Sequence, residues 1–111
     1  MNATSRDFYA DCNRDNLFRA VRRTGLTHEE VADEASRELR KIGRAERRKR
    51  RGDGVPTGVS RQLIGQLLSG KATSTHELRA VAIERALGMD DCSLFAPRVY
   101  RGTRDAVRQT A

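Results

Sequence analysis

The chain has 111 residues, 37% of them hydrophobic and 33% charged, and its 22 Lys and Arg against 15 Asp and Glu give a formal net charge of +7. This length allows one small domain with a modest core, and no apolar run approaches the roughly 18 residues of a membrane span. The start of the chain carries no apolar signal segment, so we expect a cytoplasmic protein whose basic excess meets an anionic polymer rather than a membrane.

The first predicted helix runs from Asp15 to Thr24 and ends at Gly25. Its apolar residues recur at helical spacing: Leu17, Phe18 and Val21. We expect the arginines on its polar side to form a solvated face rather than phosphate contacts: Arg19, Arg22 and Arg23. Before this helix, residues 1–14 predict either an N-terminal arm or an extra helical turn.

A second helix is predicted from about His28 to Ile42 or slightly beyond. Thr27 and Glu30 have the spacing of a capping box, in which each side chain pairs with the backbone N–H of the other residue. The apolar residues that follow recur at intervals of four, four and three: Val31, Ala35, Leu39 and Ile42.

The stretch from Arg37 to Arg51 holds the whole charge excess of the protein. It contains nine Arg or Lys against Glu38 and Glu46, a local net charge of +7. The cations at 47–51 repel one another, so we expect that run to lack order without a partner, followed by a flexible link over 52–58. The stretch can be a solvated loop, a nuclear-import-like signal or a DNA-contacting arm. We favour the arm, and an RNA-binding segment remains an alternative.

The segment from Val59 to Gly70 predicts a short helix with defined ends. Ser60 is placed to cap it, and Gly70 to end it in the left-handed conformation. Leucines and an isoleucine gather on one side of this helix: Leu63, Ile64, Leu67 and Leu68. Donor-rich side chains occupy the other side.

The rest of the chain predicts one longer helix and a final short turn. Ser74 to Glu77 form a second predicted capping box, before a helix that Gly88 ends. The residues expected on its buried side are Leu78, Val81, Ala82, Ala86 and Leu87. Asp90 or Asp91 can cap a last turn that ends at Pro97, with 99–111 as a tail. Because no alternating apolar pattern is long enough for a sheet, we predict an all-α domain.

The order of these pieces resembles the Cro/lambda-repressor-like (XRE) family of helix-turn-helix proteins, over roughly residues 15–95. The matching positions are Gly25-Leu26-Thr27, Val31-Ala32, Val59-Ser60, Ile64, Gly70-Lys71 and Leu87-Gly88. The lengthened segment between the two helices resembles the N-terminal domain of EspR-type regulators. The resemblance implies a helix-turn-helix domain over 15–98. It would be a bundle of about five helices, with an extended second helix and a basic insertion and linker at 37–58 before the recognition helix.

Binding to duplex DNA needs contacts to base edges and contacts to phosphates, and the chain can supply both. Arg can pair with guanine and Gln with adenine in the major groove, so we expect base contacts from Arg61, Gln62 and Gln66. We expect phosphate contacts from hydroxyls near helix ends and from the basic stretch: Thr27, Ser60, Ser69, Lys71, Thr73, Ser74, Thr75, Arg44, Arg47, Arg48, Lys49, Arg50 and Arg51.

The resulting prediction is a sequence-specific transcriptional regulator, with repression favoured, that binds double-stranded DNA and can form a homodimer. The resemblance implies a bacterial or phage-encoded, nucleoid-associated protein. No catalytic or metal-binding spacing is present, and Cys12 and Cys92 are expected to be reduced thiols, so we expect no enzyme, cofactor, metal or small-molecule ligand. The alternative is an antitoxin-like or accessory interaction module that binds an acidic partner through the basic segment.

Overall fold

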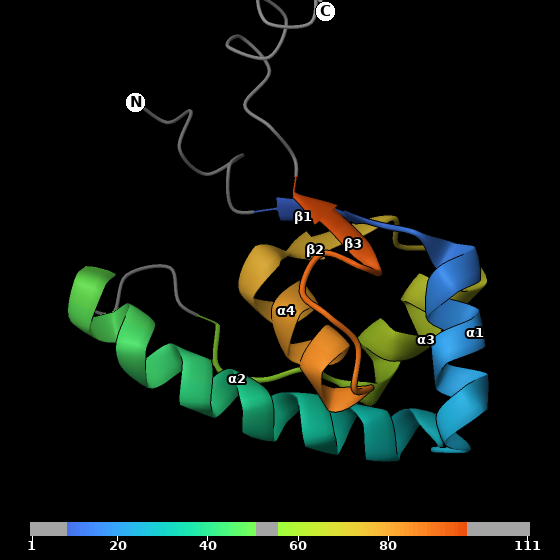
Figure 1. The fold of residues 1–111 in the computed structure, drawn as a ribbon, viewed down its shortest axis with the longest axis horizontal. Coiled ribbons are helices and arrows are strands. Elements are labelled where there is room, and N and C mark those ends of the chain that lie inside the picture. Colours follow the sequence, from blue (N-terminus) through green and yellow to red (C-terminus); the bar gives the residue numbers. More distant parts are fainter. Residues whose placement is uncertain (1–8, 51–55, 98–111) are drawn as a thin grey trace, which may run out of the picture.

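The computed structural model describes residues 9–50 and 56–97, and for 46–50 it describes the backbone. These ranges contain four helices and three short strands (Figure 1). In chain order they are β1 Tyr9–Cys12, α1 Arg14–Thr24, α2 His28–Arg50, α3 Arg61–Ser69, β2 Ser74–His76, α4 Glu77–Ala86 and β3 Phe95–Pro97.

The three strands form an antiparallel sheet in the order β2-β1-β3, so the all-α prediction is wrong. Ala10 in the central strand β1 pairs with Thr75 on one side and Pro97 on the other. Each strand has only three or four residues, too few for an alternating pattern to stand out. The partners also lie far apart along the chain, where local patterns carry no information about pairing.

The sheet also corrects three local predictions. Residues 9–12 form a strand rather than an arm or a helical turn, and residues 1–8 lie outside the described ranges. The predicted capping box at 74–77 is mostly strand β2, and α4 is instead capped by His76, whose Nδ1 accepts from the N–H of Leu78 at 3.1 Å. Pro97 belongs to the edge strand β3, where its missing N–H breaks no ladder.

The start of α2 confirms the first predicted capping box. The Thr27 hydroxyl accepts from the Glu30 N–H at 3.1 Å, and the Glu30 carboxylate accepts from the Thr27 N–H at 2.9 Å. The helix continues beyond the predicted Ile42 as far as Arg50, so the backbone of 47–50 is helical rather than disordered.

The length of α2 has an electrostatic reason. Five of its six acidic side chains lie before Ile42 and most of its basic ones lie after Leu39, which complements the helix dipole at both ends. In its middle, Arg37 pairs with Glu34, and Lys41 with Glu38 at 3.4 Å. These favourable terms offset the repulsion between neighbouring cations that had argued against order.

The core lies around α4, which packs between α2 and the sheet (Figure 1). Ala82 and Ile83 are fully buried there, with Leu17 from α1 and Leu39 from α2. Phe18, expected among the apolar residues of α1, is instead 48% exposed. The packing of α1 rests on its other apolar side chains.

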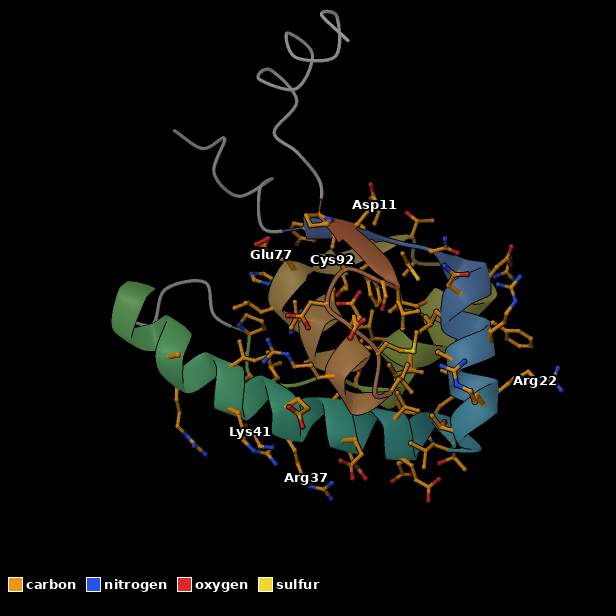
Figure 2. All side chains as sticks on the ribbon, in the orientation of Figure 1. Asp11, Arg22, Arg37, Lys41, Glu77 and Cys92 are labelled. Atoms are coloured by element: carbon orange, nitrogen blue, oxygen red, sulfur yellow. The ribbon has the colours of Figure 1, made fainter. Side chains whose placement is uncertain are left out.

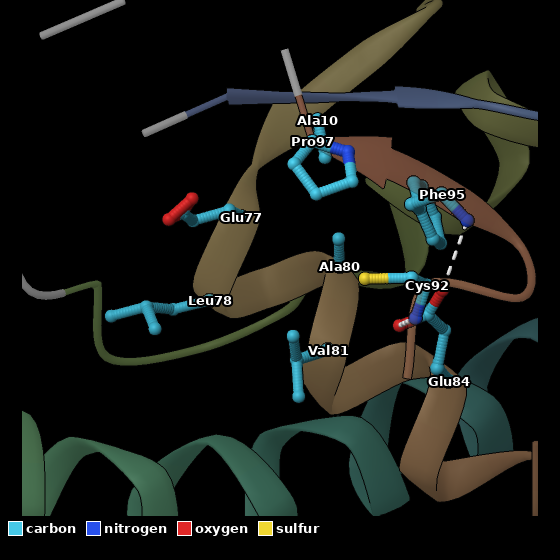
Figure 3. Close-up of a pocket in the computed structure, with 9 residues that line it drawn as sticks. All are labelled: Ala10, Glu77, Leu78, Ala80, Val81, Glu84, Cys92, Phe95 and Pro97. Carbon is cyan, nitrogen blue, oxygen red and sulfur yellow. Dashed lines mark hydrogen bonds between the residues drawn. The ribbon is translucent and has the colours of Figure 1, made fainter. Parts of the chain in front are cut away.

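One carboxylate in α4 organises the chain that leads into β3. Glu84 is 1% exposed, and it accepts from the backbone N–H groups of Cys92, Leu94 and Phe95, each at 2.9 Å. Figure 3 shows this carboxylate directed at the strand. Three donors compensate for the burial of a charged group, so the loop is fixed by Glu84.

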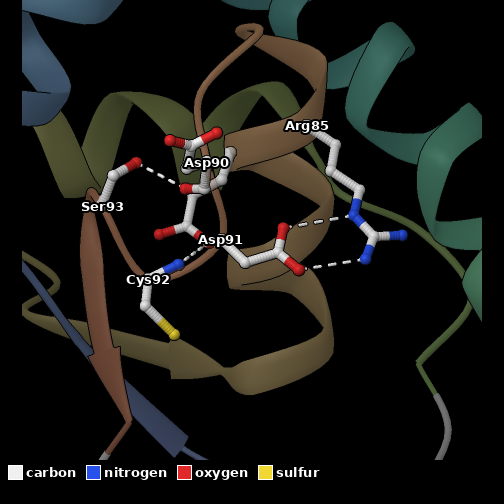
Figure 4. Close-up of polar contacts among 6 residues, drawn as sticks. Arg85, Asp90, Asp91, Cys92 and Ser93 are labelled. Carbon is white, nitrogen blue, oxygen red and sulfur yellow. Dashed lines mark hydrogen bonds and ion pairs between the residues drawn. The ribbon is translucent and has the colours of Figure 1, made fainter.

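Asp90 and Asp91 begin no helical turn, which corrects that prediction. The Asp90 carbonyl accepts from both the N–H and the hydroxyl of Ser93, and Asp91 pairs with Arg85 (Figure 4). The Nη2–Oδ2 distance of that pair is 3.0 Å, and the hydrogen bond with Arg85 lowers the pKa of Asp91 below its usual value. Cys92 follows with a positive φ of 68°.

Candidate nucleic-acid interface

The N-terminal end of α3 is fixed by contacts from two other helices. The Ser60 hydroxyl accepts from the Leu63 N–H at 3.0 Å, as the sequence predicts. One residue earlier, the Ser36 hydroxyl on α2 accepts from the Val59 N–H at 3.0 Å and donates to the Val59 carbonyl at 3.1 Å. Arg79 on α4 donates to the Gly58 carbonyl at 2.8 Å. The chain from Gly58 to Ser60 therefore enters α3 along a defined path.

The C-terminal end of α3 is fixed by α1. Gly70 takes the predicted left-handed conformation, with a φ of 87°. The Arg14 guanidinium donates to the Leu68 carbonyl at 2.7 Å, which places a cation at the negative end of the helix dipole. A Cβ on Gly70 would lie 3.4 Å from Arg14 Nη1, which is close to ordinary contact, so it is the positive φ that favours glycine here.

The two faces of α3 divide as predicted. Ile64 and Leu67 are fully buried, while Arg61 and Gln62 are exposed. Gln66, the third predicted base contact, is half-buried on the same side. Arg61 and Gln62 make no side-chain hydrogen bond or ion pair within the described ranges, so their donors and acceptors face solvent.

Gly65 in the middle of α3 faces the first turn of α2. A Cβ at this position would lie 3.6 Å from His28 Nδ1. The beginning of α2 therefore lies against the middle of α3, while Ser36, farther along α2, holds the approach to its start. The predicted hydroxyl contact Thr27 is exposed at this end of α2.

The predicted phosphate contacts fall into three groups. Those that are exposed are Thr27, Arg44, Ser60, Ser69, Lys71 and Thr73, and Ser74 is half-buried. Thr75 is 4% exposed within β2, so it does not fit this role. For the cations at 47–50 the structure describes a helical backbone, and Arg51 lies outside the described residues.

The basic half of α2 extends from the body of the protein. Figure 1 shows the end of α2 near Arg50 reaching past α4 at one end of the molecule. Arg40, Lys41 and Arg44 are exposed along it, and Figure 2 shows Arg37 and Lys41 directed away from the core. The cations are thus carried on a helix and not on a loop.

Residues 9–50 and 56–97 do not meet the requirements of a metal site or of a membrane-spanning helix. No group of three or more His, Cys, Asp or Glu there can hold a metal ion, and none of the helices there is long and apolar enough to cross a bilayer. Burial raises the pKa of the Cys12 thiol to about 11, which keeps it neutral. A pocket of about 230 Å³ between α4 and the sheet is lined mainly by apolar side chains (Figure 3).

Comparison of the chain with protein-family models, with curated proteins and with solved structures found no match in any of the three. The case for a nucleic-acid interface therefore depends on the geometry of α2 and α3.

Proposed function

We propose that this protein binds double-stranded DNA by placing α3 in the major groove, with Arg61, Gln62 and Gln66 at the base edges. The observation that carries the proposal is the way α3 is held. Contacts from α1, α2 and α4 fix its two ends, while its polar face stays open to solvent. A recognition helix fixed before binding loses little conformational freedom on the DNA.

The basic half of α2 supplies the phosphate contacts in this proposal. From Ser36, which holds the approach to α3, to Arg50 the helix rises about 21 Å at 1.5 Å per residue. If α2 runs along the DNA axis, at about 3.4 Å per base pair its basic end reaches phosphates about six base pairs from those beside the start of α3. The protected site on DNA should then extend farther on one side of the groove.

The biological role that fits this proposal is regulation of transcription, chiefly repression, by occupying a site that other proteins need. A single α3 reads one short DNA sequence in the major groove. Two copies of the chain, bound side by side, would read two such sequences. The rival role is docking of an acidic protein on the basic segment, which predicts different behaviour in salt.

The experiment measures the affinity for a labelled duplex by fluorescence anisotropy over a series of salt concentrations. One variant replaces Arg47, Arg48 and Arg50 with Ser. Removal of a single arginine–phosphate pair should flatten the slope of log K against log salt by about 0.9. We expect a decrease of about two to three units in the slope, on specific and random duplex alike, if each of these arginines meets a phosphate.

The matched control replaces three exposed arginines of α1 with Ser: Arg19, Arg22 and Arg23. It removes the same charge from the opposite end of the molecule, so its slope should stay close to that of the parent protein. An unchanged slope in the α2 variant, or equal changes in both, would rule out α2 as the phosphate-binding element. If the parent fails to bind duplex DNA at low salt, the proposed function is wrong.

A further inference from the structure

The outer face of α1 exposes an aromatic side chain. Among the described residues, the large hydrophobic side chains that are exposed are Phe18 at 48% and Tyr9 at 42%. The guanidinium of Arg22 lies over the Phe18 ring, 5.6 Å from its centroid. Aromatic residues and arginine are both enriched in protein interfaces relative to the rest of the surface.

The arginines of this face have no carboxylate partner within the described ranges. Arg19 donates to the side-chain oxygen of Asn16 at 3.0 Å, and Arg23 donates to the sulfur of Met89 at 2.9 Å. Elsewhere Arg37 and Arg85 do have carboxylate partners. Neither Arg19 nor Arg23 is therefore held in an ion pair within the described ranges, and the Arg23 guanidinium has only a weak acceptor.

A pocket lies beside these arginines, between α1 and the loop at 89–94. Its volume is about 280 Å³. Its apolar lining comes from Ala20, Met89 and Leu94, and its polar lining from Asn16, Arg19, Arg23 and Ser93. Such a pocket combines donors for an anion with a surface for an apolar group.

This surface is remote from the basic half of α2. Figure 1 shows α1 at one end of the molecule and the Arg50 end of α2 at the other. Figure 2 shows Arg22 pointing away from the body of the protein. The α1 face and the Arg50 end of α2 are therefore separate surfaces, although α1 also contacts α3 through Arg14 and Leu68.

We propose that α1 and the 89–94 loop form a docking surface for an acidic, amphipathic segment of another protein. Carboxylates of that segment pair with Arg19 and Arg23 at the pocket, and an apolar side chain covers Phe18. The guanidinium fork matches a carboxylate in two-point pairing. Nucleic acid fits less well, because a phosphate backbone offers nothing to Phe18 or to the apolar lining of the pocket.

The test uses a fluorescent peptide in which Glu and Asp alternate with Leu and Phe, and a peptide with Gln and Asn in place of the acids. Binding is measured by anisotropy at physiological salt. The first variant is Arg19→Gln with Arg23→Gln, and the second is Phe18→Ser. The matched control is Arg40→Gln with Arg44→Gln, which removes the same charge from α2. Circular dichroism establishes that each variant is folded, and a labelled duplex is titrated in parallel.

We expect the parent to prefer the acidic peptide, the Arg19 and Arg23 variant to lose about tenfold in affinity for it, and Phe18→Ser to lose about threefold. The α2 control should retain peptide binding and lose duplex binding. No preference for the acidic peptide, or equal losses in the α1 and α2 double variants, would overturn the proposal. A larger loss of duplex binding in the α1 variant than in the control would assign α1 to nucleic acid instead. Peptide binding by a chain that binds no duplex would leave this proposal standing and remove the proposed function.

Discussion

Replacing Ser36 with Ala tests whether the contact between α2 and the link positions α3. The change removes two hydrogen bonds of 3.0 and 3.1 Å, both to the backbone of Val59. Val59 is 6% exposed, so its N–H and carbonyl would lose their partners in a largely buried place. An unpaired buried polar group costs about 1–3 kcal/mol.

Water can reduce this cost. A pocket of about 480 Å³ next to Ser36 and Val59 lets solvent approach the freed groups. We therefore expect a loss of about 1–2 kcal/mol in the free energy of unfolding, at or below the roughly 2 kcal/mol minimum for two groups without water. For a domain of this size, that corresponds to a decrease in Tm of about 4–12 °C.

Urea unfolding followed by circular dichroism measures the stability, and anisotropy with a labelled duplex measures the binding. The control for the stability measurement alone is Thr73→Ala, since the exposed Thr73 hydroxyl makes no hydrogen bond within the described ranges; its free energy of unfolding should change by less than about 0.5 kcal/mol. If Ser36→Ala unfolds like the parent and binds DNA equally well, Ser36 does not hold α3 in place.

Two further predictions concern the loop before β3 and the two thiols. Glu84→Ala should lower the free energy of unfolding by about 3 kcal/mol, because three backbone N–H groups lose a charged acceptor; a urea midpoint equal to that of the parent would contradict this role. At pH 8, exposed Cys92 should react with iodoacetamide much faster than Cys12, because the half-buried Cys12 thiol has a pKa of about 11. Mass spectrometry of the labelled peptides measures the two rates, and equal rates would contradict this prediction.

The parts of the fold that could be predicted from sequence are those with local causes. Ser60 and Gly70 bound α3 through contacts within a few residues, and the Thr27–Glu30 box starts α2 in the same way. The buried face of α3 followed from the spacing of Ile64 and Leu67 alone. The exposed positions of Arg61 and Gln62 followed with it.

The features that were missed depend on distant parts of the chain. Strand β1 is defined by partners more than sixty residues away, and no local pattern marks it. In the sequence, Ser36 occupies an ordinary surface position of α2. Its role depends on Val59, twenty-three residues later, whose backbone packs against it. Thr75 was expected to contact phosphate as a hydroxyl at a helix start, and the sheet buries it.

Glu84 was missed for a related reason. A single acid between Ile83 and Arg85 is typical of a partly exposed helix, and its three backbone donors come from a loop that follows the helix. One signal was available in the sequence. The residues one helical turn before and after Glu84 are apolar, namely Ala80, Val81 and Leu87, which leaves little polar surface around this side chain. A buried acid in such a helix needs donors from nearby backbone.

The most direct test of the central claim is to compare preferred and random DNA. A preferred duplex is first selected from a random pool, and the affinities of the parent and of Arg61→Ala, Gln62→Ala and Gln66→Ala are then measured on it and on random duplex at one salt concentration. If α3 contacts base edges, each variant should lose about 1–3 kcal/mol on the preferred duplex and little on random duplex. Equal losses on both duplexes, or a selection that yields no preferred sequence, would contradict the assignment of α3 as the recognition helix.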